Sequence, residues 1–145
     1  SIVFGNGITL IPSSAFSKCV QLTSVIIGNG VTNIESRAFE GCSSLESVVM
    51  GNNVTSIGEH AFNGCSSLQS ITIPDSVKSI ESNAFENCIN LCEVHFDGSE
   101  PPKLGDNVFG VVKEDFKIFV PEDSLSKYNL AWETSEYLSY ICSNI

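Results

Sequence analysis

The chain repeats itself every 23 residues, and this periodicity constrains its fold more than any other feature. One column of the repeat holds Leu22, Leu45, Leu68 and Leu91. Four more columns share the spacing: Val25, Val48, Ile71, Val94; Ile27, Met50, Ile73, Phe96; Ile11, Ile34, Ile57, Ile80; and Ala-Phe pairs ending at Phe16, Phe39, Phe62, Phe85. A unit this short cannot cover its own apolar residues, so neighbouring units must stack to form a continuous core.

The periodicity extends beyond these four units in both directions. Ile2 and Phe4 lie one period before Val25 and Ile27. Leu104, Val108, Phe109, Ile118 and Val120 fit the columns after a one-residue insertion, which we place between Gly98 and Pro102. The repeat therefore predicts one elongated array over most of the chain.

One unit can be interpreted physically from Leu22 to Leu45. Ser24–Ile27 alternates and is β-branched, which predicts a short strand with Val25 and Ile27 facing inward. Gly28–Gly30 predicts a turn, after which Ile34 returns to the core. Residues 36–40 are expected to form a helical turn that Ser36 caps and Gly41 ends. Strands of successive units would pair in parallel, giving a mainly β, α/β solenoid with one parallel sheet and short helical turns on the opposite face.

The unit L-x-S-V-x-I-G/P-x-x-V-x-x-I-x-x-x-A-F-x-x-C-x-x resembles the BspA-like leucine-rich repeats of bacterial cell-surface proteins. The resemblance covers residues 1 to about 121. The tail from Phe119 to Trp132 is similar to the V-P-x-x-S-x-x-x-Y-x-x-A-W segment at the end of many such proteins. The resemblance implies a right-handed leucine-rich-repeat superhelix and a cell-surface or secreted location. It also implies a role in adhesion or host interaction, with no catalytic residue and no cofactor.

After Pro121 the period is lost, which divides the chain into a solenoid (1–121) and a C-terminal cap (122–145). A short helix is expected from Ser124 to Leu130, with Asp123 or Ser124 as its N-cap, and a second from Ser135 to Cys142. The apolar residues available to cover the end of the stack are Leu125, Tyr128, Leu130, Trp132 and Tyr137.

No comparable cap is visible at the N-terminal end, where Ser1 leads directly into a strand. This end is expected to expose the core-type residues Ile2, Phe4, Ile8 and Ile11. Self-association through this end is therefore expected.

Six cysteines raise the question of disulfides or metal. Cys19, Cys42, Cys65 and Cys88 form one column, so their side chains point the same way, one unit apart. A line of four sulfurs cannot surround one zinc ion, and parallel Cβ vectors suit disulfide torsions poorly. Buried free thiols are favoured over a disulfide or a metal site. Cys92 and Cys142 lie off the column, and Cys92 is expected near the surface.

Cys92 and His95 could in principle form a thiol nucleophile and base, with Glu93 between them. A solvated strand on a flat sheet offers no pocket and no oxyanion donors, so an inert surface pair is favoured. His60 is expected to be a solvated residue on the outer turn, and the serine ladder Ser24, Ser47 and Ser70 is explained by repetition. Neither a catalytic residue nor a metal site is predicted.

The charge balance narrows the choice of partners. With 17 acidic and 7 basic residues the formal net charge is −10, and ten of the acids lie between Glu93 and Glu136. Such a surface repels phosphate backbones and anionic membranes, so a nucleic-acid partner is disfavoured. No apolar run approaches the length of about 18 residues that a membrane-spanning helix needs.

A protein or a matrix or glycan ligand would bind on the outward face of the strands, whose side chains form a continuous array. The candidate partner-binding residues are Val3, Ile26, Val49, Thr72, His95, Phe119 and Lys117. Exposed apolar stripes often mark partner sites, although β-propensity alone also explains them. Two other functions use the same core: a structural spacer that displays another domain, and an accessory module of a larger enzyme.

Overall fold

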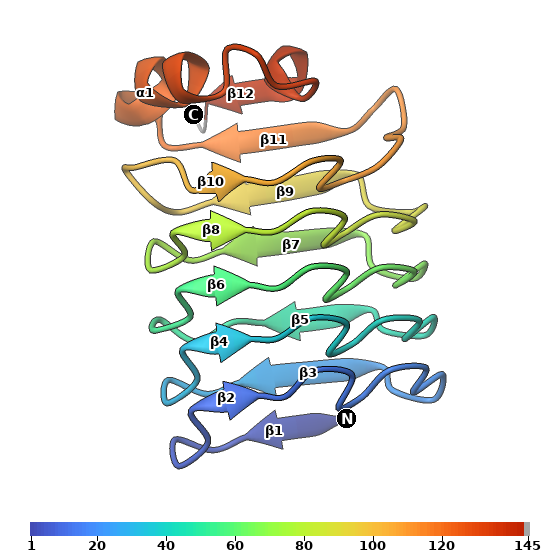
Figure 1. Cartoon of the computed structure of the whole chain (residues 1–145). Helices are drawn as coiled ribbons and strands as arrows, with labels where there is room; N and C mark the ends of the chain where they lie inside the picture. Colours follow the sequence, from blue (N-terminus) through green and yellow to red (C-terminus); the bar gives the residue numbers. More distant parts are fainter. Residues whose placement is uncertain (144–145) are drawn as a thin grey trace.

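The computed structural model describes residues 1–143 and shows a stack of parallel coils closed at one end by a small helical cap (Figure 1). Each coil carries a strand on a broad face and a two-residue strand on the opposite face. The broad face holds β1 (Ile2–Phe4), β3 (Ser24–Ile27), β5 (Ser47–Val49), β7 (Ser70–Ile73), β9 (Glu93–Phe96) and β11 (Lys117–Val120). The opposite face holds β2 (Leu10–Ile11), β4 (Asn33–Ile34), β6 (Ser56–Ile57), β8 (Ser79–Ile80) and β10 (Lys103–Leu104).

The broad face follows the 23-residue register that the sequence predicts. Val25 of β3 lies opposite Val48 of β5, and Ile71 of β7 lies opposite Val94 of β9. Val25 and Ile27 are buried whereas Ile26 between them is exposed, as the alternation indicates. Ile118 pairs with Val94, which confirms the placement of the last repeat after the insertion.

The prediction of a single parallel sheet was wrong in two respects. The short strands of the opposite face form a second, five-stranded parallel sheet in the order β10-β8-β6-β4-β2. The sequence indicated only that the isoleucines of this face return to the core. On the broad face the strands form two sheets, β1-β3-β5 and β7-β9-β11-β12, because no ladder joins β5 to β7.

The predicted helical turns at residues 36–40 and their equivalents are also wrong, since these segments are turns without helix. Arg37 lies in the left-handed region with φ of 60°, which interrupts a right-handed helix one residue after its expected cap. The same column holds Ser14, His60, Asn83 and Asn107, all with positive φ. A second left-handed position lies four residues further on, and in two coils it is filled by glycine: Gly41 with φ of 73° and Gly64 with φ of 77°.

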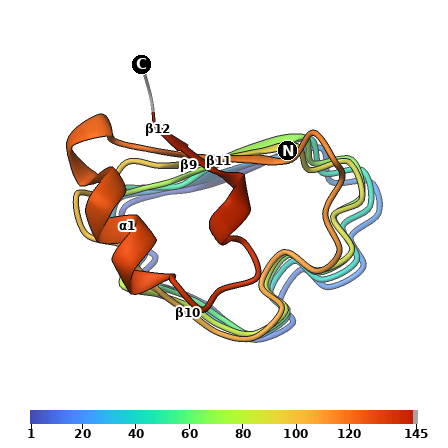
Figure 2. The ribbon, with the colours of Figure 1, turned by 90° about the horizontal axis from the view of Figure 1, so that it is seen from above.

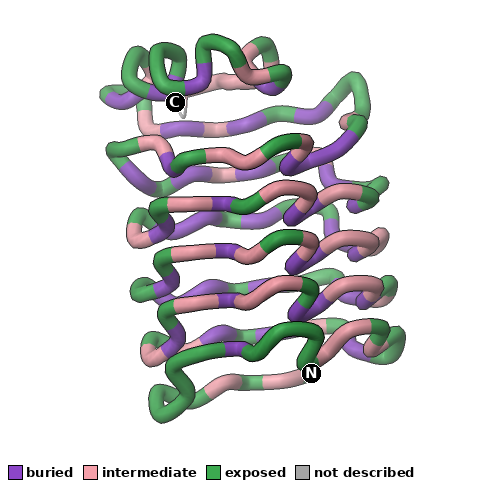
Figure 3. The backbone as a smooth tube through the Cα atoms, viewed as in Figure 1, coloured by how far each residue is buried: buried purple, intermediate pink, exposed green. Residues whose placement is uncertain are grey.

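The core runs through the stack as continuous rows of like side chains. Neighbouring rings of the phenylalanine row stack nearly parallel, with centroids 5.2 Å apart for Phe39–Phe62 and for Phe62–Phe85. Cys42, Cys65 and Cys88 are buried beside this row, and Cys19 is half-buried. Each buried thiol donates to a carbonyl of the preceding coil, as Cys42 does to Phe16 at 3.2 Å. Figure 3 shows this burial repeating from coil to coil.

The cap departs from the expected pair of helices. A 3-10 turn, η1 (Glu122–Ser124), leads into α1 (Leu125–Ala131), which fits the first predicted helix, although Ser124 makes no side-chain cap bond. The second predicted helix is wrong: the 3-10 turn η2 (Leu138–Tyr140) leads into β12 (Ile141–Ser143), which pairs in parallel with β11. Residues 144–145 of the predicted cap lie outside the described residues. Figure 2 shows α1 lying across one end of the coil outline.

The cap covers the last coil with three buried aromatic residues, Tyr128, Trp132 and Tyr137. Their polar atoms bond to the backbone below: Tyr128 Oη donates to the Gly98 carbonyl at 2.9 Å, and Trp132 Nε1 to the Pro102 carbonyl at 3.0 Å. Tyr137 Oη accepts from the Phe109 N–H at 3.0 Å. Leu130, expected among the covering residues, is instead exposed.

The N-terminal coil exposes less of its core than expected. Ile8 is exposed, and Ile2 and Phe4 are half-buried. Ile11 is fully buried, so its expected exposure was wrong. Its neighbour Ile34 on the next coil lies opposite it in the second sheet, which accounts for the burial.

Candidate functional site on the outer strand face

The predicted outward column lies on the outer side of the broad face, and its N-terminal part is a continuous apolar stripe. Val3 lies opposite Ile26, and Ile26 opposite Val49, in successive parallel strands. Their side chains are 68%, 46% and 54% exposed. The stripe therefore presents three branched apolar residues to solvent, one per strand.

Beside the stripe the surface is hollowed where β5 and β7 are not joined by a ladder. The hollow measures about 210 Å³ and is lined by Val48, Val49, Met50, Asn52, Thr72, Pro74 and Asp97. Val48 and Met50 are less deeply buried than their column neighbours in β3 and β7, and both line this gap. The discontinuity adds a hollow of mixed apolar and polar lining beside Val49, and nothing in the sequence columns indicates it.

The C-terminal part of the same column is polar and aromatic. The His95 and Phe119 rings stack with centroids 4.8 Å apart, and both residues are half-buried. His95 Nε2 lies 3.0 Å from Glu93 Oε2. Lys117 lies opposite Glu93 in the adjacent strand, so charges of both signs flank the ring pair. The structure thus brings His95, Phe119, Glu93 and Lys117 together. Thr72 lies opposite His95 in the next strand and also lines the hollow.

The thiol–imidazole pair of Cys92 and His95, which the sequence analysis disfavours, does not form. The Cys92 thiol donates to the Gln69 carbonyl at 3.3 Å, and His95 contacts Glu93 and Phe119 instead. In the buried column, burial raises the pKa of the Cys42 thiol to about 11. The pKa of Cys65 is raised further, by the neighbouring Cys88 thiol and by burial. These thiols are therefore held in the protonated, unreactive form.

His60 is half-buried and less solvated than expected, because it joins a polar row along the turns. Its Nδ1 lies 3.0 Å from Asn63 Nδ2. Asn63, Asn83 and Asn107 all donate to the Glu86 carboxylate, at 3.1, 3.0 and 3.1 Å. The amides satisfy this acid and tie three coils together, which is a structural role that single columns do not reveal.

A larger groove, about 780 Å³ in volume, lies between the last coil and the cap. No column of the repeat indicates this groove, because it depends on how the loop after α1 crosses the end of the stack. Within residues 1–143 no cluster of His, Cys, Asp or Glu is arranged to hold a metal ion. The helices in this part of the chain are too short and too polar to span a membrane.

Parallel coils of 23 residues, a broad face of parallel strands and a row of stacked phenylalanines together define a leucine-rich-repeat solenoid. Residues 1–126 match the BspA type leucine rich repeat region in six copies, so the chain belongs to this family. The family is generally non-enzymatic. No curated protein matches the chain significantly.

Several solved structures resemble the fold. A leucine rich cell surface protein from Faecalibacterium prausnitzii A2-165 is 27% identical, with a TM-score of 0.75 over 90% of this chain and 35% of that one. A leucine-rich repeat protein from Bacteroides capillosus is 35% identical, with a TM-score of 0.57 over 63% of this chain and 64% of that one. One from Bacteroides ovatus is 25% identical, with a TM-score of 0.65 over 99% of this chain and 42% of that one. The chain thus spans about a third of the F. prausnitzii protein.

Proposed function

We propose that the chain is a non-enzymatic interaction module of a cell-surface or secreted protein, and that its outer strand face binds a macromolecular partner. The observation that carries the proposal is the exposed stripe Val3, Ile26 and Val49, which continues into the hollow of about 210 Å³ beside Val49. Apolar side chains next to a concave floor offer a partner both buried area and an anchoring pocket.

The cell-surface location and adhesive role are supported by the family and by the printed description of the F. prausnitzii protein. The partner classes that fit are a matrix protein, a mucin or a glycan. The ring pair of His95 and Phe119 supports this choice, because aromatic faces bind both peptide and sugar surfaces. The net charge of −10 argues against nucleic acid.

The test is a binding screen of the chain against purified matrix proteins, mucins and glycans, repeated with the Ile26→Glu/Val49→Glu variant. Both side chains are exposed, so folding should be nearly intact, with a loss of at most about 1 kcal/mol. Binding should weaken by about tenfold or more, since two charges enter an apolar contact.

A matched control carries the same two charges elsewhere. Ile89 and Val111 are exposed apolar residues outside the strand sheets, so Ile89→Glu/Val111→Glu should bind like the unmodified chain. Equal weakening by both double variants would refute a strand-face site. If no member of the panel binds, the spacer function is favoured instead.

A further inference from the structure

Every coil supplies two consecutive residues that pair with the backbone of the preceding coil. The Glu35 N–H donates to the Ile11 carbonyl, and the Ser36 carbonyl accepts from the Ser14 N–H, both at 3.0 Å. The later coils repeat both bonds. The N–H groups of Gly58, Glu81 and Gly105 donate to the carbonyls of Ile34, Ile57 and Ile80, respectively. The carbonyls of Glu59, Ser82 and Asp106 accept from the N–H groups of Arg37, His60 and Asn83, respectively. The distances span 2.7 to 3.2 Å, so the arrangement is a fixed rule of the stack.

The last coil presents the same two groups without a following coil. By the rule they are the Leu104 carbonyl and the Asn107 N–H, and within residues 1–143 neither has a hydrogen-bond partner. The cap supplies partners for the backbone groups on both sides of them. The Trp132 indole N–H donates to the Pro102 carbonyl, and the Tyr137 hydroxyl accepts from the Phe109 N–H. The cap thus supplies hydrogen-bond partners at Pro102 and Phe109, on either side of the site, but not at Leu104 and Asn107.

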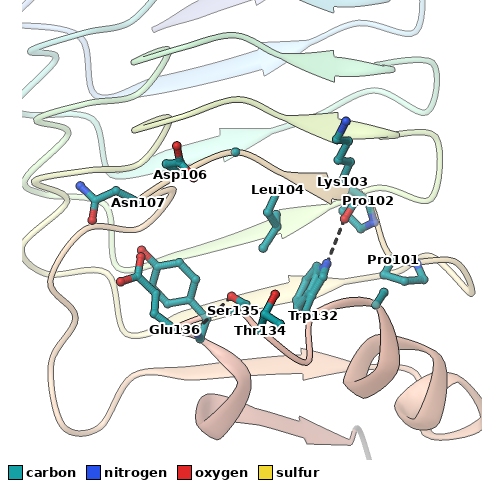
Figure 4. Close-up of a pocket in the computed structure, with 13 residues that line it drawn as sticks. Pro101, Pro102, Lys103, Leu104, Asp106, Asn107, Trp132, Thr134, Ser135 and Glu136 are labelled. Carbon is teal, nitrogen blue, oxygen red and sulfur yellow. Dashed lines mark hydrogen bonds between the residues drawn. The ribbon is translucent and has the colours of Figure 1, made fainter.

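The groove of about 780 Å³ lies at this position, between Lys103–Asn107 and the loop from Ala131 to Tyr137 (Figure 4). Trp132 and Tyr137 form its apolar wall, and their hydrogen bonds to the last coil hold that wall in place. Asn107 keeps its φ of 54° while its side chain donates to Glu86 at 3.1 Å. The free Asn107 N–H is therefore part of a rigid turn.

We propose that this groove binds a short, extended, basic peptide segment of a partner, which occupies the place of the missing coil residues. One peptide N–H donates to the Leu104 carbonyl, and the carbonyl of the next peptide residue accepts from the Asn107 N–H. Strand addition to an unpaired sheet edge is an established way of binding peptides. This site is separate from the strand face and does not depend on the function proposed there.

The charge of the groove selects the peptide. Its charged lining residues are Asp106, Glu136 and Lys103, and the Lys103 side chain extends away from the cap in Figure 4. Carboxylates thus dominate a groove in a chain of net charge −10, which favours lysine or arginine beside the paired main chain. A phosphate-bearing ligand would be repelled for the same reason.

The test uses a fluorescein-labelled, N-acetylated and C-amidated peptide of alternating lysine and valine, together with NMR hydrogen exchange. The Asn107 amide should exchange rapidly in the free chain and slow by about tenfold or more at saturating peptide. The Phe109 amide, already bonded to Tyr137 Oη, should be protected in both states. Unchanged exchange at Asn107 under saturation would overturn the proposal.

Two comparisons separate main-chain pairing from charge attraction alone. A peptide N-methylated on its valines and lysines loses its donors, and it should bind at least about fivefold more weakly to the unmodified chain. Glu136→Gln should weaken the lysine peptide by about threefold, whereas Glu133→Gln, an exposed acid outside the groove, should not. Equal binding of the N-methylated peptide, or equal effects of the two variants, would contradict a groove site.

Discussion

At the scale of single residues, the cap acts through the polar atoms of its aromatic side chains. Tyr137 Oη accepts from the Phe109 N–H at 3.0 Å and donates to the Gly110 carbonyl at 3.2 Å. In the preceding coil the equivalent amide, that of Phe85, donates to a backbone carbonyl, that of Val108. The Tyr137 hydroxyl therefore takes the place of the backbone carbonyl that the next coil would offer to the Phe109 N–H.

We predict that Tyr137→Phe lowers the free energy of unfolding by about 2 to 3 kcal/mol, because it leaves a buried N–H and carbonyl without a partner. Urea denaturation followed by circular dichroism measures the loss. Tyr140→Phe is the control, since the hydroxyl of half-buried Tyr140 has no partner among the described residues. Equal stability of the two variants would show that the Tyr137 hydroxyl does not complete the ladder.

The buried thiols predict how stability changes at alkaline pH. Burial raises the pKa of Cys42 from 9.0 to about 11, so the native state keeps its proton where the unfolded state loses it. The thiol's contribution is fully present below pH 9 and is lost as the pH rises toward 11. The free energy of unfolding, measured in urea at fixed ionic strength, should fall across this window. Cys42→Ala should show a shallower fall, and a level profile in the unmodified chain would contradict the assignment.

At the scale of elements, the turns are set by backbone conformation more than by helix propensity. Two positions per coil have positive φ, and glycine fills the second at Gly41 and Gly64. Phe62 lies two residues after His60 of the positive-φ column, so the backbone conformation at His60 helps to place its ring in the phenylalanine row. A glycine in this conformation relieves strain that a Cβ would introduce.

We predict that Gly64→Ala destabilises the chain by about 1 kcal/mol, because φ of 77° is strained for a residue with a Cβ. The added methyl would meet nothing closer than 3.6 Å, so strain and not collision sets the cost. Gly7→Ala is the control, since that glycine has open space and no positive φ. Thermal unfolding compares the two, and similar melting temperatures would contradict the strain argument.

The sequence predicted the strands well because alternation and a fixed period act together at Val25, Ile26 and Ile27. The conformation of the turns could not be predicted in this way. Arg37, His60 and Asn83 share a positive φ although their side chains are of different types, so the column shows no common residue that would indicate it. The second sheet was missed because its strands are two residues long, too short to alternate. The spacing of Tyr137, Leu138 and Ile141 suits one face of a helix and therefore predicts a helix after Ser135. In the structure, parallel pairing with β11 makes residues 141–143 the strand β12 instead.

At the scale of the whole molecule, repetition uses nearly all apolar residues for stacking and leaves few surfaces with distinct chemistry. The outward placement of the candidate strand-face residues could be predicted from the columns. Side chains alternate along a strand, so the residues between two inward-facing ones must face outward. The hollow between β5 and β7 and the groove at the cap could not be predicted. Both arise where backbone pairing between coils is interrupted, once between β5 and β7 and once at the end of the stack.

An NMR titration of the isotope-labelled chain with a ligand from the binding screen would locate the proposed strand-face site residue by residue. We expect the backbone amides of Val3, Ile26, Val49 and Thr72 to shift together and to saturate at one dissociation constant. Turn residues such as Ser44 and Ser67, away from the strand sheets, should stay unchanged. Shifts confined to the turns, with a silent strand face, would contradict it.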